Sequence, residues 1–125
     1  MKVVRLADAF EYPVTGHFDM RALRLHNKET SNTVDYTLGL SHFLPGGGTE
    51  YVETGVELIY FILEGEMTVR TKDETIVLKK YDSIHFNVGD GKEIRNETNL
   101  PASMLVIAGP TGRVVESGTG HGISG

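Results

Sequence analysis

Four side chains in the middle of the chain could take part in acid–base chemistry: His42, Tyr60, His85 and Lys92. An imidazole changes its charge near neutral pH, so either histidine could act as a general base. A lysine removed from water could hold a carboxylate by its charge, act as a base, or form a Schiff base with a carbonyl compound. The alternative for Lys92 is a solvated turn, because its neighbours read D-G-K-E and buried lysines without a partner are rare.

Two carboxylates, Glu53 and Glu57, belong to an acidic run that could meet the histidines. Together with His42 and His85 they would form a non-standard metal site. Such a site requires a bulge, because Glu57 is one residue out of phase with Leu58 and faces the other side of its strand. The alternative is an acidic loop that faces solvent.

Four basic side chains near the N-terminus form a second candidate cluster: His17, Arg21, Arg24 and His26. Histidine and arginine side chains can bind anions, so this region could form an anion-binding rim. The alternative is a solvated strand face, and the sequence leaves the role of this region open.

The elements that must position these side chains are β-strands. Fifteen glycines and many short β-rich runs favour an all-β domain. Strands at such regular intervals, without a βαβ pattern, predict a sandwich or barrel. A turn is expected after residue 63, where Gly65 could adopt a positive φ. The expected strands lie at 37–44, 58–63, 67–71, 74–78, 83–87, 93–96 and 102–107.

Strand alternation also bears on the histidines, because successive side chains point to opposite faces. His42 is in phase with the leucines of 37–44, which favours a position inside the barrel. His85 points away from Ile84 and Phe86, and alternation does not settle which side of that strand is inside. For each histidine the alternative is a structural or surface role.

The two ends of the chain are less regular. Residues 18–25 alternate loosely and could add one or two strands to the barrel edge. The polar segment 28–32 is expected to be a connecting loop. The glycine-rich tail, 109–125, has few apolar residues and is expected to be flexible, or ordered only against a partner subunit.

The segment from Gly46 to Gly65 resembles the first motif of the cupin superfamily, which reads G-x5-H-x-H-x3-E-x6-G. Counting from Gly46 places the three metal ligands of the motif at Val52, Thr54 and Leu58. The closing glycine of the motif coincides with Gly65. The spacing of the motif is therefore present without its ligands.

The segment ending at Asn96 resembles the second cupin motif, G-x5-P-x-G-x2-H-x3-N. Gly89 and Asn96 match the pattern, whereas Lys92 occupies the position of the fourth ligand. Tyr81 and Asn87 take the places of the first glycine and the proline. Two motifs in the right order are a strong signal for the fold and a weaker one for function.

The resemblance implies a small single-domain cupin, a double-stranded β-helix or jelly-roll barrel, with the conserved barrel at 39–107. None of the four ligand positions holds a histidine or carboxylate, so we expect no metal and no other cofactor. The alternative to a pocket is a filled barrel core. The spacing of the two family motifs implies which side chains face the cavity and bind a ligand. These residues are Val52, Thr54, Leu58, Tyr60, Ile62, Lys92 and Ile94.

The predicted function is metal-independent binding of a small organic ligand, with a carboxylate as one candidate. The resemblance also implies one form of this function, because metal-free members of the superfamily epimerise sugars with a histidine base and a tyrosine partner, and Tyr60 with His42 or His85 could serve in this way. Whether the protein is an enzyme is left open. The alternatives are a metal-dependent dioxygenase or decarboxylase with displaced ligands, and a non-catalytic regulatory or structural dimer.

Composition limits the classes further. A chain of 125 residues is expected to form one domain, 1–125. The absence of cysteine excludes disulfides and thiolate zinc sites, and a net charge of −5 argues against nucleic acid. No segment has the apolar length of a signal peptide or a membrane span, so a cytoplasmic location is expected. The family resemblance implies a homodimer, and Ile59, Phe61 and Leu63 form an outward apolar set that could pack against a partner.

Overall fold

The computed structural model describes residues 1–110, and these form an antiparallel β-barrel. Its helical segments are short: a 3₁₀ turn, η1 (Leu6–Asp8), and one α-helical turn, α1 (Lys28–Ser31). No helix within residues 1–110 is long and apolar enough to cross a membrane. The strands are β1 (Phe10–Tyr12), β2 (His17–His26), β3 (Thr37–Thr49), β4 (Val52–Glu53), β5 (Leu58–Glu64), β6 (Met67–Arg70), β7 (Thr75–Leu78), β8 (Ser83–Phe86), β9 (Gly91–Arg95) and β10 (Ala102–Ala108).

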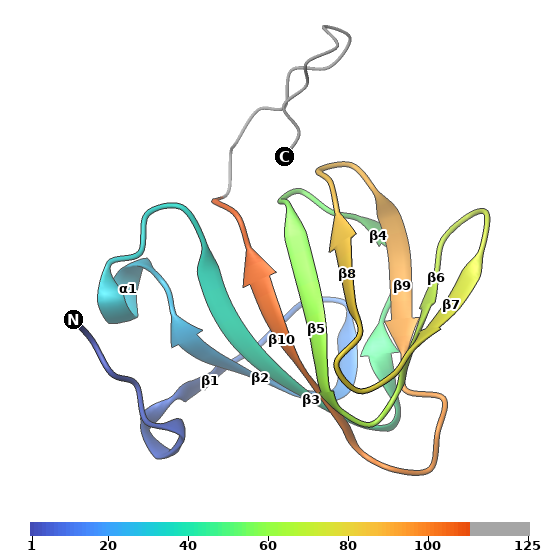
Figure 1. The fold of residues 1–125 in the computed structure, drawn as a ribbon, viewed down its shortest axis with the longest axis horizontal. Helices are drawn as coiled ribbons and strands as arrows, with labels where there is room; N and C mark the ends of the chain where they lie inside the picture. The colour runs from blue at the N-terminus through green and yellow to red at the C-terminus, as the bar shows by residue number, and fades with distance from the viewer. Residues whose placement is uncertain (111–125) are drawn as a thin grey trace, which may run out of the picture.

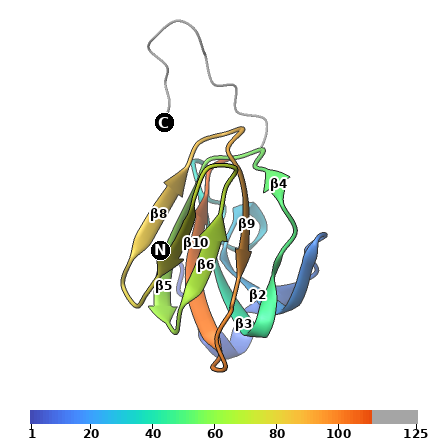
Figure 2. The ribbon, with the colours of Figure 1, turned by 90° about the vertical axis from the view of Figure 1, so that its right-hand side faces the viewer.

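The long strand β3 connects the two sides of the barrel. Strands β2, β3, β10, β5 and β8 lie side by side in this order (Figure 1). Strands β7, β6 and β9 form the second side, and β9 also pairs with β4 and, through Arg95 and Gly48, with β3. In the perpendicular view β8 lies on the left side of the barrel and β4 on the right (Figure 2). The predicted all-β barrel is confirmed.

The observed strands agree with the seven expected ones within a few residues, except that β3 extends to Thr49. The expected edge strand at 18–25 is β2. Residues 28–32 were expected to be a loop, but α1 forms there because Asn27 and Thr30 make a reciprocal capping box, with Thr30 N donating to Asn27 Oδ1 at 2.8 Å. Most of the tail predicted to be flexible, from residue 111, lies outside the described residues.

The core lies between the two sides of the barrel. Its most deeply buried side chains are apolar, except that of Asn96. On β5 the expected alternation is confirmed: Leu58, Tyr60 and Ile62 are buried, whereas Ile59 is exposed. On β9 the same agreement holds, because Lys92 and Ile94 are buried.

The side chain of Asn96 connects the end of the second motif segment with β3 and with the loop that precedes β10. Its Nδ2 donates to the carbonyl oxygens of Phe43 and Leu100 at 3.2 and 2.8 Å. Its Oδ1 accepts from the amide and hydroxyl of Thr98 at 3.0 and 2.8 Å. Only an amide side chain can donate to the two carbonyl oxygens and also accept from the two Thr98 groups, which explains why this position needs asparagine.

We expect Asn96→Asp to lower the free energy of unfolding by about 3 kcal/mol, because a carboxylate oxygen would face two carbonyl oxygens without a donor. Chemical denaturation measures this loss. Asn99→Asp, the same change at an exposed position of the same loop, should change the stability by less than about 0.5 kcal/mol. Equal losses in both variants would contradict this role of Asn96.

Candidate functional site

A cavity of about 210 Å³ lies inside the barrel between β2, β3, β5, β9 and β10. Most of its wall is apolar. Its polar groups come from five different strands and converge on one space, which is the usual composition of a small-molecule site. These polar residues are Tyr12, His17, Ser41, Thr49, Tyr60 and Lys92.

Backbone hydrogen bonds bring the two motif segments together at both ends. Gly46 N donates to Asn96 O at 2.7 Å, and Gly89 N donates to Thr54 O at 2.8 Å. Between these contacts, Val52 of β4 pairs with Lys92 of β9. The register therefore places Lys92 at the cavity wall, opposite the segment that would hold the first two ligands of the motif.

Lys92 is only 5% exposed and has no ion-pair or hydrogen-bond partner among residues 1–110. Its Nζ lies 5.6 Å from the ring centre of Phe86 and 6.0 Å from that of Tyr60. Burial therefore lowers the pKa of the Lys92 ammonium. The contacts with the two rings are weak cation–π contacts and replace little of the lost hydration.

Tyr60 is the second polar group of the cavity. Its side chain is 5% exposed, and its ring packs edge-on against Phe86 with the centres 5.4 Å apart. Burial raises the pKa of the Tyr60 hydroxyl well above its ordinary value, and the neighbouring Tyr12 adds to this effect. The hydroxyl is therefore neutral at physiological pH and can donate a hydrogen bond to a ligand.

His17, at the start of β2, supplies the one imidazole of the cavity wall described here. Its Nδ1 lies 3.0 Å from the carbonyl oxygen of Thr15, so in the neutral ring Nδ1 carries the hydrogen. Nε2 then keeps its lone pair. Burial lowers the pKa of His17, the Thr15 hydrogen bond opposes this shift, and the positive charge of Lys92 reinforces it.

The stability of the protein should depend on His17 at acidic pH. Because the pKa of His17 is lower in the folded state, the unfolded state binds more protons between this pKa and the ordinary value of 6.5. The free energy of unfolding should therefore fall as the pH falls through this window. Denaturation curves at a series of pH values should show a smaller fall for His17→Gln than for the wild type. His42→Gln changes an exposed histidine, so its free energy of unfolding should fall with pH as much as that of the wild type. A smaller fall in His42→Gln would contradict the attribution of this pH dependence to His17.

The comparisons with known proteins agree with this architecture. A family model described as "Cupin domain" matches residues 39–108. The chain belongs to the cupin family. A protein named β-D-galactosidase from Mycobacterium tuberculosis is 34% identical to this cupin over 115 residues, which are 91% of this chain and 99% of that protein.

Solved structures show the same fold at lower identity. The polyketide cyclase RemF from Streptomyces resistomycificus superposes with a TM-score of 0.79 at 19% identity, covering 90% of this cupin and 82% of that chain. A sugar phosphate isomerase from Silicibacter pomeroyi gives a TM-score of 0.72 at 19% identity, covering 86% and 75% of the two chains. These similarities support the jelly-roll fold of the cupin.

The cavity of this cupin does not fit the metal ion that the fold family implies. A transition-metal site needs several imidazole and carboxylate ligands. The described wall contains one histidine and no Asp or Glu, and it carries the cationic side chain of Lys92. Within residues 1–110 no group of three or more His, Cys, Asp and Glu side chains could hold a metal.

The structure places five of the seven expected ligand-binding residues at the cavity wall: Val52, Leu58, Tyr60, Lys92 and Ile94. The other two do not line it. Thr54 donates its hydroxyl hydrogen to the carbonyl oxygen of Val56 at 2.7 Å, and Ile62 is a fully buried core residue.

His42 does not project into the barrel, and the alternative surface position is the one observed. Ser41 and Phe43 point inward on β3, and His42 is exposed on the outer face. The leucines used to set the phase also lie on that outer face, which is itself partly apolar. His85 is exposed too, and its Nε2 lies 2.6 Å from Glu57 Oε2.

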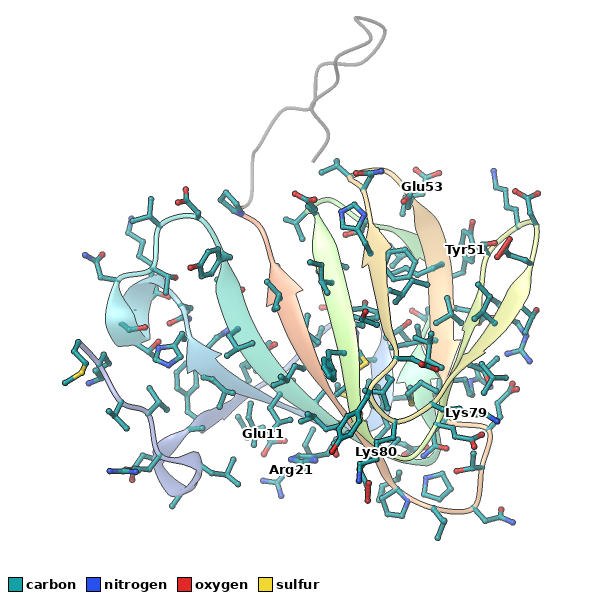
Figure 3. All side chains as sticks on the ribbon, in the orientation of Figure 1. Glu11, Arg21, Tyr51, Glu53, Lys79 and Lys80 are labelled. Carbon is teal, nitrogen blue, oxygen red and sulfur yellow. The ribbon has the colours of Figure 1, made fainter. Side chains whose placement is uncertain are left out.

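The alternative metal site built from His42, Glu53, Glu57 and His85 was therefore wrong. His85 and Glu57 form a pair at the surface, and no third ligand completes a site there in the described part of the chain. Figure 3 shows Glu53 near the upper end of the barrel. No bulge brings the acidic run inside.

The N-terminal basic side chains do not form one rim. Arg21 is exposed and pairs with Glu11 at 2.8 Å, as the adjacent labels in Figure 3 show. The Arg24 guanidinium stacks 3.8 Å from the ring centre of Tyr12, and His26 Nδ1 lies 2.7 Å from the hydroxyl oxygen of Ser31. Only His17 of the four reaches the cavity, and a strand bulge at Asp19, which the sequence pattern did not reveal, turns it inward.

Proposed function

We propose that this cupin binds a small organic anion in its barrel cavity and that the Lys92 ammonium supplies the charge that a metal ion supplies in other barrels. The observation that carries the proposal is a buried lysine without a partner in residues 1–110, at the wall of a cavity that contains no carboxylate. An anion would neutralise that charge in a water-poor site, where electrostatic attraction is strong.

The size and lining of the cavity favour a short carboxylic acid. Its 210 Å³ correspond to the volume of about seven water molecules in the liquid. A ligand of a few carbon atoms would fit, whereas most drug-sized ligands need a larger pocket. Tyr60 would donate a hydrogen bond to the ligand, and the apolar wall would contact its carbon atoms.

Acid–base chemistry on such a ligand, including isomerisation or epimerisation, would use His17 with Tyr60. The earlier candidates, His42 and His85, lie on the outside of the barrel. His17 Nε2 has a free lone pair, and its lowered pKa keeps the ring neutral at physiological pH. This is the protonation state that a general base requires.

Titration with L-lactate tests the anion site. The wild type should bind lactate, and the bound acid should raise its stability by about 2.7 kcal/mol at a concentration near 100 times Kd. Lys92→Met should lose this binding. Lys79→Met removes an exposed lysine that does not line the cavity and lies near the lower end of the barrel in Figure 3, so this variant should keep the binding. Unchanged lactate affinity in Lys92→Met would overturn the proposal.

A second candidate function is the hydrolysis of a galactoside, because a relative with 34% identity carries the name β-D-galactosidase. Glycoside hydrolysis ordinarily uses two carboxylates on either side of the scissile bond. The cavity wall offers none among residues 1–110, but a groove of about 440 Å³ at the barrel surface is lined by Glu53, Asp90 and Tyr51, among others. Release of nitrophenol from nitrophenyl β-D-galactoside, lost in Glu53→Gln and kept in Lys92→Met, would favour this candidate over the anion site.

We also propose that two copies of the cupin pair through the outer face of β3, β10 and β5. Leu40, Leu105 and Phe61 are register neighbours on that face, and Ile59 beside them is 38% exposed. An apolar row of this kind is typical of a protein interface. Sedimentation equilibrium should give a dimer, and a monomer at all concentrations would contradict the pairing.

A further inference from the structure

We infer that Lys92 forms an imine with a small 2-oxo acid in the barrel cavity. This inference rests on the proposed anion site and names its substrate class. The ammonium of Lys92 would attract the carboxylate and bring the adjacent carbonyl carbon to Nζ. The same nitrogen would then act as a nucleophile.

The surroundings of Lys92 are those of a reactive amine. Only an uncharged amine can attack a carbonyl carbon, and a lysine reaches this state most easily in an apolar, desolvated pocket. Lys92 is 5% exposed, lies near the rings of Tyr60 and Phe86, and has no acidic partner among the described residues. Burial lowers the pKa of its ammonium, which increases the fraction of free amine.

A purely structural role for this lysine is difficult to support. A long polar side chain that only stabilises a fold normally places its charge in water or pairs it with a carboxylate. Lys92 pairs with no carboxylate in the part of the chain described here, and only 5% of the residue's surface is exposed. Its neighbours on β4 and β9, Val52 and Ile94, are apolar, so a methionine would suit the same space.

The proton that Lys92 must lose has an acceptor in the same cavity. His17 has a neutral ring with Nδ1–H held by Thr15, and Nε2 is free to take the proton. The Nζ lone pair then forms a bond to the carbonyl carbon, and the protonated His17 returns its proton to the carbonyl oxygen to give a carbinolamine. Transfer of one further proton from Nζ to that oxygen lets it leave as water and gives the iminium, and addition of water reverses the reaction.

The iminium would also keep the charge that the proposed anion site requires. Its positive nitrogen lies next to the carboxylate of the same 2-oxo acid, so the pair remains neutral inside the apolar wall. The carbon atom next to the iminium carbon becomes more acidic. The neutral imidazole of His17, in the same cavity wall, is the base that would remove a proton from it. This carbon acidity is the chemistry that an imine-forming lysine offers to an enzyme.

Reduction with borohydride tests the inference. Wild-type protein incubated with pyruvate and sodium borohydride should gain the mass of one N-carboxyethyl group. Peptide mapping should place most of this adduct on Lys92, and an excess of lactate should reduce it. Lys79→Met should be trapped like the wild type, because it removes only an exposed lysine.

Lys92→Arg separates the imine from the anion site, because it keeps a positive charge but cannot form an imine. It should give no adduct at residue 92, and its affinity for lactate measures separately how much of the anion binding depends on charge alone. Wild-type protein that binds lactate but shows no adduct on Lys92, or no preference for Lys92 over exposed lysines, overturns the imine and leaves the anion site standing. Wild-type protein that binds neither lactate nor pyruvate overturns both. The wild-type mapping decides the matter even where Lys92→Arg fails to fold.

Discussion

Lys92→Met is expected to raise the free energy of unfolding by about 1–2 kcal/mol at neutral pH, as the replacement of other buried charges by apolar side chains does. Lys92 is buried with no partner in residues 1–110, and methionine has a similar length without the charge. A substitution that stabilises the fold while it removes ligand binding is the signature of a residue kept for function.

The pH dependence of this gain follows from the lowered pKa of Lys92. Between the folded-state pKa and the unfolded-state value of about 10.4, the unfolded chain binds more protons. Wild-type stability should therefore rise with pH in this window, and the advantage of Lys92→Met should shrink. Denaturation at a series of pH values measures both effects, with Lys79→Met as the control. A less stable Lys92→Met protein would show that the ammonium has a stabilising partner.

Gly65→Ala is expected to destabilise the cupin by about 3 kcal/mol or more, through backbone strain and overlap together. Gly65 has φ +77°, and a Cβ there would lie 2.6 Å from Pro101 O and 2.9 Å from Ala102 Cα. Neither backbone atom can move without disturbing the start of β10. Thermal or chemical denaturation measures the loss.

Gly46→Ala is the matched control for this prediction. Gly46 also has a positive φ, +85°, but a Cβ there would meet nothing within 4 Å. Only the backbone preference is lost, which costs about 1 kcal/mol. Similar losses in Gly65→Ala and Gly46→Ala would contradict the importance of the close approach to β10.

The motif spacing predicted the barrel and the inward faces of β5 and β9 because each inward position is fixed by strand alternation from a turn glycine. Tyr81 shows that the backbone geometry of the motif is kept even where one of its glycines is replaced. It replaces a motif glycine and still adopts φ +73°, while its ring packs against Phe61 with the centres 6.0 Å apart. Hydrogen bonds also hold this turn, because Tyr81 N donates to Ile62 O and Lys79 N donates to Asp82 Oδ2, each at 2.8 Å.

The sequence could not reveal His17 as a cavity residue. His17 and Met20 both face the cavity although an odd number of positions separates them, because the register of β2 shifts at Asp19, which has φ +51°. A single bulge reverses which side chains face inward. His42 was misplaced for a related reason, since an apolar outer face gives the same alternation as an apolar inner one.

The transition-metal content of the purified cupin tests the central claim most directly. Protein purified without added metal should contain far less than one equivalent of any transition metal per chain, because the described cavity wall offers one imidazole, no carboxylate and a lysine cation. The same protein should bind lactate. One equivalent of zinc, iron, manganese, nickel or copper per chain, bound tightly enough to survive purification, would contradict the assignment of the site to Lys92.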